Sequence, residues 1–204
     1  MTPKSASPQT RLGVLEAVLA ASLYGSSGVF AVRLFDMGVT PQSVALFRMI
    51  LGALLLFVWA LVVRRHILAV PRRTMVLLLL GGGIPVAAFQ VVYQLSIDAA
   101  GVPTTVALLY LAPVFVVAAS PLLLGERPGV VRVLLSLVVV AGVWLTVLGA
   151  DEVEAHFGSR GLLWGVLSGA FYAAYTLWGR YATPRWGTLP TVVYASVGAA
   201  VILG

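Results

Sequence analysis

Seven apolar segments, separated by short polar stretches, make up most of this chain. They run over residues 12–34, 43–63, 74–97, 102–124, 130–149, 161–180 and 190–204. An α-helix rises about 1.5 Å per residue, so about 20 apolar residues cross the hydrocarbon core of a bilayer, which is roughly 30 Å thick. The first six segments are long enough for this. They predict an all-α integral membrane protein built as a multi-span helical bundle.

The seventh segment ends the chain at Gly204 after only 15 residues. It has no charge, no polar tail and no interfacial anchor, so a natural C-terminus there would leave a carboxylate at membrane depth. We therefore interpret the sequence as a fragment of a longer protein.

The fourth segment contains two prolines, Pro113 and Pro121, inside its apolar run. Proline has no N–H to donate, so each one frees the carbonyl four residues earlier, here those of Leu109 and Val117. A span that is broken in this way, with Tyr110 near the break, is typical of a helix that lines a cavity.

The composition agrees with a membrane protein and argues against several kinds of site. Of the 204 residues, 60% are hydrophobic and 10% are charged, and the mean hydropathy is +1.03. Soluble domains carry about 25% charged residues. There is no cysteine, and the two histidines, His66 and His156, both lie between spans. We expect no metal and no other cofactor. Because motifs for nucleotide binding or hydrolytic catalysis are missing, we also expect no enzyme.

The net charge of +6 follows the predicted topology. With the N-terminus in the cytoplasm, ten lysines and arginines fall on the cytoplasmic side, whereas the outer side holds only Arg33 and Arg160. Three acids fall in the outer loop, within residues 151–154. This asymmetry is the positive-inside pattern of membrane proteins. The expected partners are therefore the lipid bilayer and a small-molecule substrate, and not nucleic acid.

An internal repeat divides the chain. A shift of 148 residues places Leu15, Val18, Leu19, Tyr24 and Val44 on Leu163, Val166, Leu167, Tyr172 and Val192. Since five spans is an odd number, the second copy enters the membrane from the opposite side, as in transporters with inverted repeats. The predicted organisation is a cytoplasmic tail (1–11), a first repeat (12–150), an outer acidic linker (151–160) and the start of a second repeat (161–204).

Three stretches resemble the EamA-type repeat of the drug/metabolite transporter superfamily. They are SLYGSSGVFAVR in the first segment, YQLSIDAAGVPTTVALLYLAPVF across a short outer turn, and GERP after the proline-containing segment. The resemblance implies ten spans in two inverted five-span repeats, a transport function and a location in a bacterial inner membrane. This chain departs from the family at Tyr24, where tryptophan is frequent, and it provides only the first part of the second repeat.

Arg48 is the most informative polar residue, because it lies five or six positions into the second segment. An arginine at the centre of a span costs about 2.5–3.5 kcal/mol. It is either a cavity cation that meets a substrate carboxylate or phosphate, or an arginine that snorkels outward or donates to freed carbonyls. Glu16, one turn into the first segment, is either a proton-binding carboxylate or an interfacial partner of Arg11. Arg48 and Glu16 enter from opposite sides and are not expected to pair.

Gln90, Tyr93 and Gln94 share one face of the third segment, at a depth similar to that of Arg48 and Tyr110. Amide and phenol groups of this kind suit the orientation of a zwitterionic or polar solute. They equally suit hydrogen bonding between helices. We take all five as candidates for the substrate cavity.

Small and aromatic residues supply further candidates. Glycines and serines predict close helix approach in the first segment, and so do Gly161, Gly165 and Gly169 in the sixth. The additional cavity candidates are Tyr24, Ser27, Pro113, Tyr172 and Tyr175. Glu126 in GERP is a candidate for gating or proton coupling, although a capping contact with Arg127 or Arg132 explains it as well.

The leading hypothesis is a secondary transporter that exports small polar metabolites, such as amino acids or amines, by alternating access. The alternative is a non-transporting or truncated membrane subunit, a remnant of such a transporter, because 204 residues provide one repeat and part of another. A homodimer stays open, although the charge bias of ten to two argues against an antiparallel dimer of dual topology.

Overall fold

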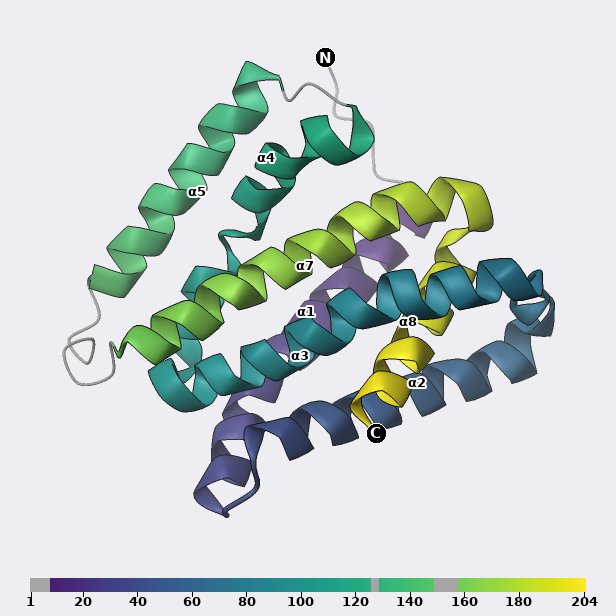
Figure 1. The fold of residues 1–204 in the computed structure, drawn as a ribbon, viewed down its shortest axis with the longest axis horizontal. Coiled ribbons are helices and arrows are strands. Elements are labelled where there is room, and N and C mark those ends of the chain that lie inside the picture. The colour runs from purple at the N-terminus through teal and green to yellow at the C-terminus, as the bar shows by residue number, and fades with distance from the viewer. Residues whose placement is uncertain (1–7, 126–128, 149–157) are drawn as a thin grey trace.

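The computed structural model describes residues 8–125, 129–148 and 158–204, and these ranges are helical with short turns. The helices are α1 (Pro8–Asp36), α2 (Pro41–Arg64), the 3-10 turn η1 (Arg65–Leu68), α3 (Arg72–Leu109), α4 (Ala112–Leu124), α5 (Val130–Leu148), α7 (Ser159–Trp186) and α8 (Thr188–Leu203). Figure 1 shows them as one bundle around α3. The predicted all-α multi-span architecture is confirmed.

The helices differ in how well they match a bilayer. Three of them, α1, α2 and α3, are long and apolar enough to cross a membrane, whereas α4, α5 and α8 are apolar but shorter. α7 has 28 residues but is in neither group. Its sequence is rich in small residues and carries arginines near both ends, and its buried face packs against α3 and α4. The sixth predicted span is therefore present as a helix packed on α3 and α4, outside the group that matches a membrane span by length and composition.

The turn predicted between the third span (74–97) and the fourth span (102–124) is present at Gly101. α3 comprises two helical parts that meet at Gly101, where the backbone is not helical: φ is +75° and ψ is 168°. The hydroxyls of Ser96 and Thr105 lie 2.8 Å apart, although nine residues of uninterrupted helix would separate them by about 13 Å. The chain therefore turns back at Gly101, where glycine adopts the positive φ without a Cβ clash.

The predicted break beside Pro113 is present. α3 ends at Leu109, and α4 begins only at Ala112. Further along α4, the Ser120 hydroxyl donates to the Val117 carbonyl at 3.2 Å. This is one of the two carbonyls that the prolines free, and a neighbouring side chain satisfies it, as an apolar environment requires.

α3 is the central helix, and it packs most extensively against α7 and α8. The packing relies on glycine, because a Cβ added at Gly83 would lie 2.8 Å from the carbonyl carbon of Gly198 on α8. On α7, added Cβ atoms at Gly161, Gly165 and Gly169 would likewise crowd α3 and the start of α4. The close approach predicted from the glycines of the sixth segment is confirmed.

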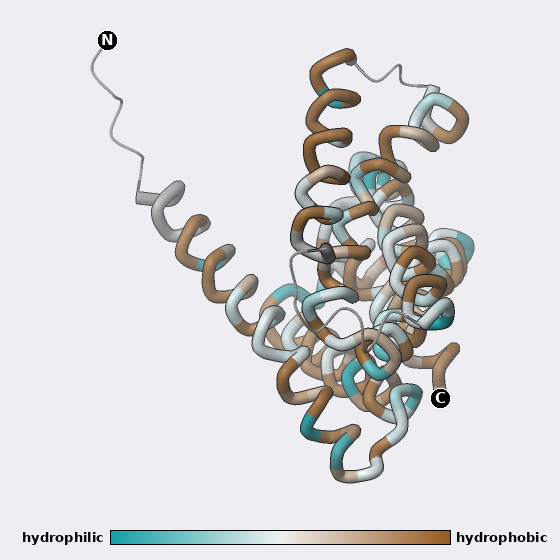
Figure 2. The backbone as a smooth tube through the Cα atoms, turned by 90° about the vertical axis from the view of Figure 1, so that its left-hand side faces the viewer, coloured by the Kyte–Doolittle hydropathy of each residue, from teal (hydrophilic) through white to brown (hydrophobic). Residues whose placement is uncertain are grey.

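α1 is attached more loosely. A Cβ at Gly28 would lie 3.0 Å from the Val102 side chain, whereas a Cβ at Gly25 would meet nothing within 4 Å. The N-terminal half of α1 leans away from the other helices in Figure 2. The close approach predicted for the first segment is thus right at Gly28 and wrong for the turns before it, where the serine side chains are exposed.

An inverted repeat requires the first helices of its two copies, here α1 and α7, to run in opposite directions. α1 and α7 run in opposite directions across Figure 1. The shift of 148 residues also places the turn 37–40 on residues 185–188, where α7 ends and α8 begins. Repeat-equivalent helices of opposite direction border the substrate site in inverted-repeat transporters.

Candidate functional site

Four aromatic rings from three helices form a continuous row, which we call the aromatic ladder. Tyr24 of α1 lies 6.5 Å from Tyr93 of α3, measured between ring centroids. Tyr93 lies 5.4 Å from Phe89 on the same helix, and Phe89 lies 5.3 Å from Tyr172 of α7. Tilted pairs at these distances are favourable by about 0.5–1.5 kcal/mol each. Tyr24 and Tyr172 are equivalent under the repeat shift, so one tyrosine from each copy packs against the same pair of rings on α3.

Arg48 of α2 lies at the α1 end of the ladder. Its guanidinium carbon is 4.8 Å from the centroid of the Tyr24 ring, within the range of a cation–π contact. The arginine is only partly buried. The guanidinium lies over the ring face of Tyr24, and no ion pair with Arg48 is found among the described residues.

Two buried amides lie on α3 next to the ladder. Gln94 is fully buried and Gln90 is 8% exposed. Gln90 donates to the Met49 sulfur at 3.0 Å, but its oxygen and both polar atoms of Gln94 have no hydrogen-bond partner among the described protein groups. An unpaired buried amide costs about 1–3 kcal/mol. Buried polar groups of this kind are usually hydrogen-bonded, so these atoms are suited to a partner other than the described side chains.

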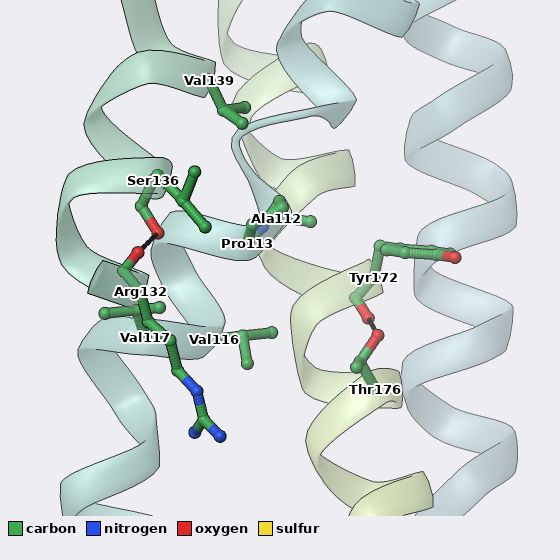
Figure 3. A pocket seen from close by; sticks show the side chains of 10 residues that line it. Ala112, Pro113, Val116, Val117, Arg132, Ser136, Val139, Tyr172 and Thr176 are labelled. Carbon is green, nitrogen blue, oxygen red and sulfur yellow. Dashed lines mark hydrogen bonds between the residues drawn. The ribbon is translucent and has the colours of Figure 1, made fainter. Parts of the chain in front are cut away.

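A cavity of about 390 Å³ lies beyond the other end of the ladder, between α4, α5 and α7 (Figure 3). Pro113 and Tyr172, both candidates from the sequence, line it together with Arg132 of α5. Two hydroxyls on its wall donate hydrogen bonds within their own helices. Ser136 donates to the Arg132 carbonyl at 2.9 Å, and Thr176 donates to the Tyr172 carbonyl at 2.9 Å.

The remaining candidates are more scattered. Tyr110 is 58% exposed and lines a second cavity, between α3 and α5. The Ser27 hydroxyl donates to the Tyr24 carbonyl of its own helix, and Tyr175 is partly buried on α7. Glu16 is exposed on α1, eight residues before Tyr24. Glu126 lies outside the described residues.

The sequence reasoning missed several residues that complete this region. Phe89 connects the two tyrosines of the ladder, and Met49 accepts the Gln90 bond. Neither differs in the sequence from an ordinary apolar residue of a span. Arg132 and Ser136 did carry a signal, because they are polar residues one turn apart on the otherwise apolar first half of α5.

Among the described residues, no group of three histidine, cysteine or acidic side chains is placed to hold a metal ion. The chemistry that the region offers is therefore that of one guanidinium, phenol hydroxyls, unpaired amides and ring faces. Groups of this kind orient polar ligands in binding sites.

Comparison with known proteins places these features in context. The model of the EamA-like transporter family matches residues 11–148. A curated relative, the "Uncharacterized inner membrane transporter YicL" of Salmonella typhimurium (strain LT2), is 28% identical over 198 residues. The matched part covers 95% of this chain and 66% of the relative, so the chain spans just under two thirds of that protein's length. No solved structure matches the chain.

Proposed function

Because this chain belongs to the EamA-like transporter family, we propose that it forms part of a secondary transporter that exports small polar metabolites, such as amino acids or amines, across a bacterial inner membrane. The N-terminus lies in the cytoplasm in this proposal, because ten of the lysines and arginines then fall on that side. The inner-membrane location is supported by the relative from Salmonella typhimurium, whose name places it there.

The observation that carries the proposal is Arg48 at the end of the aromatic ladder. Repeat-equivalent helices α1 and α7 both reach the ladder, and substrate sites of inverted-repeat transporters lie at such an interface. The guanidinium is held over the Tyr24 ring, so its planar fork is oriented before a ligand arrives. A carboxylate that accepts two N–H bonds from this fork gains both affinity and orientation.

The glutamines extend the same site. With a carboxylate at Arg48, the unpaired amide atoms of Gln90 and Gln94 suit the ammonium or other polar groups of an amino acid. Gln94 is fully buried, so we expect a ligand to reach it only after helices have moved. We expect such movement at the break between α3 and α4, because Pro113 has no N–H to donate to the Leu109 carbonyl.

The test is transport by the protein expressed from its complete reading frame. Proteoliposomes are loaded with radiolabelled amino acids or amines, and efflux is followed with and without a proton gradient. Arg48→Ala removes a charge-assisted hydrogen bond worth about 1.5–3 kcal/mol, so we expect transport efficiency to fall roughly tenfold to hundredfold. Tyr24→Phe keeps the ring under the guanidinium and should have a much smaller effect than Tyr24→Ala.

Arg33→Ala is the matched control, since Arg33 is exposed at the outer end of α1. It removes the same side chain from a place remote from the ladder, and we expect wild-type efflux. Normal transport by Arg48→Ala, with equal amounts of inserted protein, would refute the assignment of Arg48. Failure to move any amino acid or amine would refute the substrate class.

A further inference from the structure

The cavity between α4, α5 and α7 has two unlike ends. Figure 3 shows the guanidinium of Arg132 at one end and Val139 at the other. The walls between them are mostly apolar, formed by Val116, Val117 and Leu135. At about 390 Å³ the cavity falls within the size range of ligand-binding pockets.

The cavity offers a cation but few other polar contacts. The hydroxyls of Ser136 and Thr176 already donate to carbonyls of their own helices. A small polar metabolite would therefore lose its hydration over most of its surface without gaining partners, which is unfavourable. The lining instead suits a ligand with one anionic end and a long apolar body.

The direction of the cavity matches that of a lipid in the bilayer. Arg132 is the third residue of α5 and so lies close to a membrane interface, whereas Val139 lies seven residues later, about 10 Å deeper along the helix. A phospholipid places its head group at the interface and its acyl chains toward the midplane. The wall residue Leu135 is 60% exposed, so the cavity can be entered from the surrounding bilayer.

We propose that this cavity binds an anionic phospholipid of the surrounding leaflet, with its phosphate at Arg132 and an acyl chain along α5 toward Val139. The far end of the chain then reaches Pro113 and Tyr172, beside the break before α4 and at one end of the aromatic ladder. This site is separate from the Arg48 site. Its test is a binding measurement, which does not depend on transport.

The experiment compares dioleoyl phosphatidylglycerol with dioleoyl phosphatidylcholine, two lipids with the same chains and different head-group charge. Each is added to the delipidated, detergent-solubilised protein, and bound lipid is counted by native mass spectrometry. We expect about fivefold tighter retention of phosphatidylglycerol, the effect of one arginine near an anionic lipid. Arg132→Gln should remove this preference, while Arg73→Gln, which removes an exposed arginine at the start of α3, should keep it.

A second variant tests the apolar half of the site. Val116→Trp fills the cavity without changing charge, so we expect it to reduce retention of both lipids. Equal retention of the two lipids by the wild type would overturn the proposal without reference to any variant. An equal loss in Arg132→Gln and Arg73→Gln would also overturn it, and so would full displacement of phosphatidylglycerol by glycerol 1-phosphate, which carries the head-group charge without a chain.

Discussion

The contact between α3 and α8 allows a specific stability prediction, because the backbones of the two helices lie directly against each other. A Cβ added at Gly83 would lie 2.8 Å from the carbonyl carbon of Gly198, and 2.9 Å from both the Gly198 Cα and the Ala199 nitrogen. Ordinary contacts of a Cβ begin at 3.4 Å, so Gly83→Ala needs about 0.6 Å more space. All three crowded atoms belong to the backbone of α8, so no side chain can rotate away. The two helices must separate.

Two opposing effects set the change in the free energy of unfolding caused by Gly83→Ala. Forcing an extra methyl group into a well-packed site costs about 1–3 kcal/mol. Alanine is favoured over glycine within a helix by up to about 1 kcal/mol, which offsets part of this. We expect Gly83→Ala to lower the free energy of unfolding by about 1–2 kcal/mol. For a chain of this size each 1 kcal/mol shifts Tm by about 2–4 °C, so Tm should fall by about 2–8 °C.

The assay is thermal unfolding of the purified protein in detergent, followed by tryptophan fluorescence. Gly52→Ala is the matched control, because an added Cβ on that face of α2 meets nothing within 4 Å. It should leave Tm unchanged or raise it slightly. The reasoning fails if Gly83→Ala is as stable as the control, since the helices would then have room that the structure does not show.

Two more predictions use the same measurement. Ser120→Ala removes the donor to the Val117 carbonyl and should lower the free energy of unfolding by about 1 kcal/mol. This loss should be smaller in a Pro121→Ala background, because alanine restores a backbone N–H for that carbonyl. Equal losses in both backgrounds would contradict this account. Gly28→Ala places its Cβ 3.0 Å from the Val102 side chain, which can shift. We therefore expect a smaller fall in Tm than for Gly83→Ala. An equal or larger fall would show that α1 is held as rigidly as α8.

Most of the helices could be predicted from the sequence, because long apolar segments have no other stable conformation in a bilayer. The turn at Gly101 could be predicted as well, since it falls between the third and fourth apolar segments; its backbone angles and the contact between Ser96 and Thr105 could not. Both depend on how α3 meets its own continuation, which periodicity does not encode.

The candidate site, too, could be predicted only in part. The repeat shift pairs Tyr24 with Tyr172 in the sequence, and the structure brings both to one row of rings. The connection through Phe89 could not be predicted, because a phenylalanine in an apolar span carries no sign of its neighbours. Arg48 was a candidate from its depth alone, whereas its contact with Tyr24 depends on the crossing of α1 and α2.

The contacts of α3 also indicate which helices would move together in the transport cycle that we propose. On the side of α7 and α8, glycines such as Gly83 and Gly165 bring backbone and side-chain atoms to distances that leave no room for sliding. On the side of α1, only Gly28 makes a comparable approach, and its partner is a flexible valine side chain. We therefore expect α3 to stay with α7 and α8, while α1 shifts relative to them. Arg48 and Tyr24 lie at that looser boundary, so a carboxylate bound there would be enclosed or released by the same movement. The difference in Tm between the Gly83 and Gly28 variants measures this contrast directly.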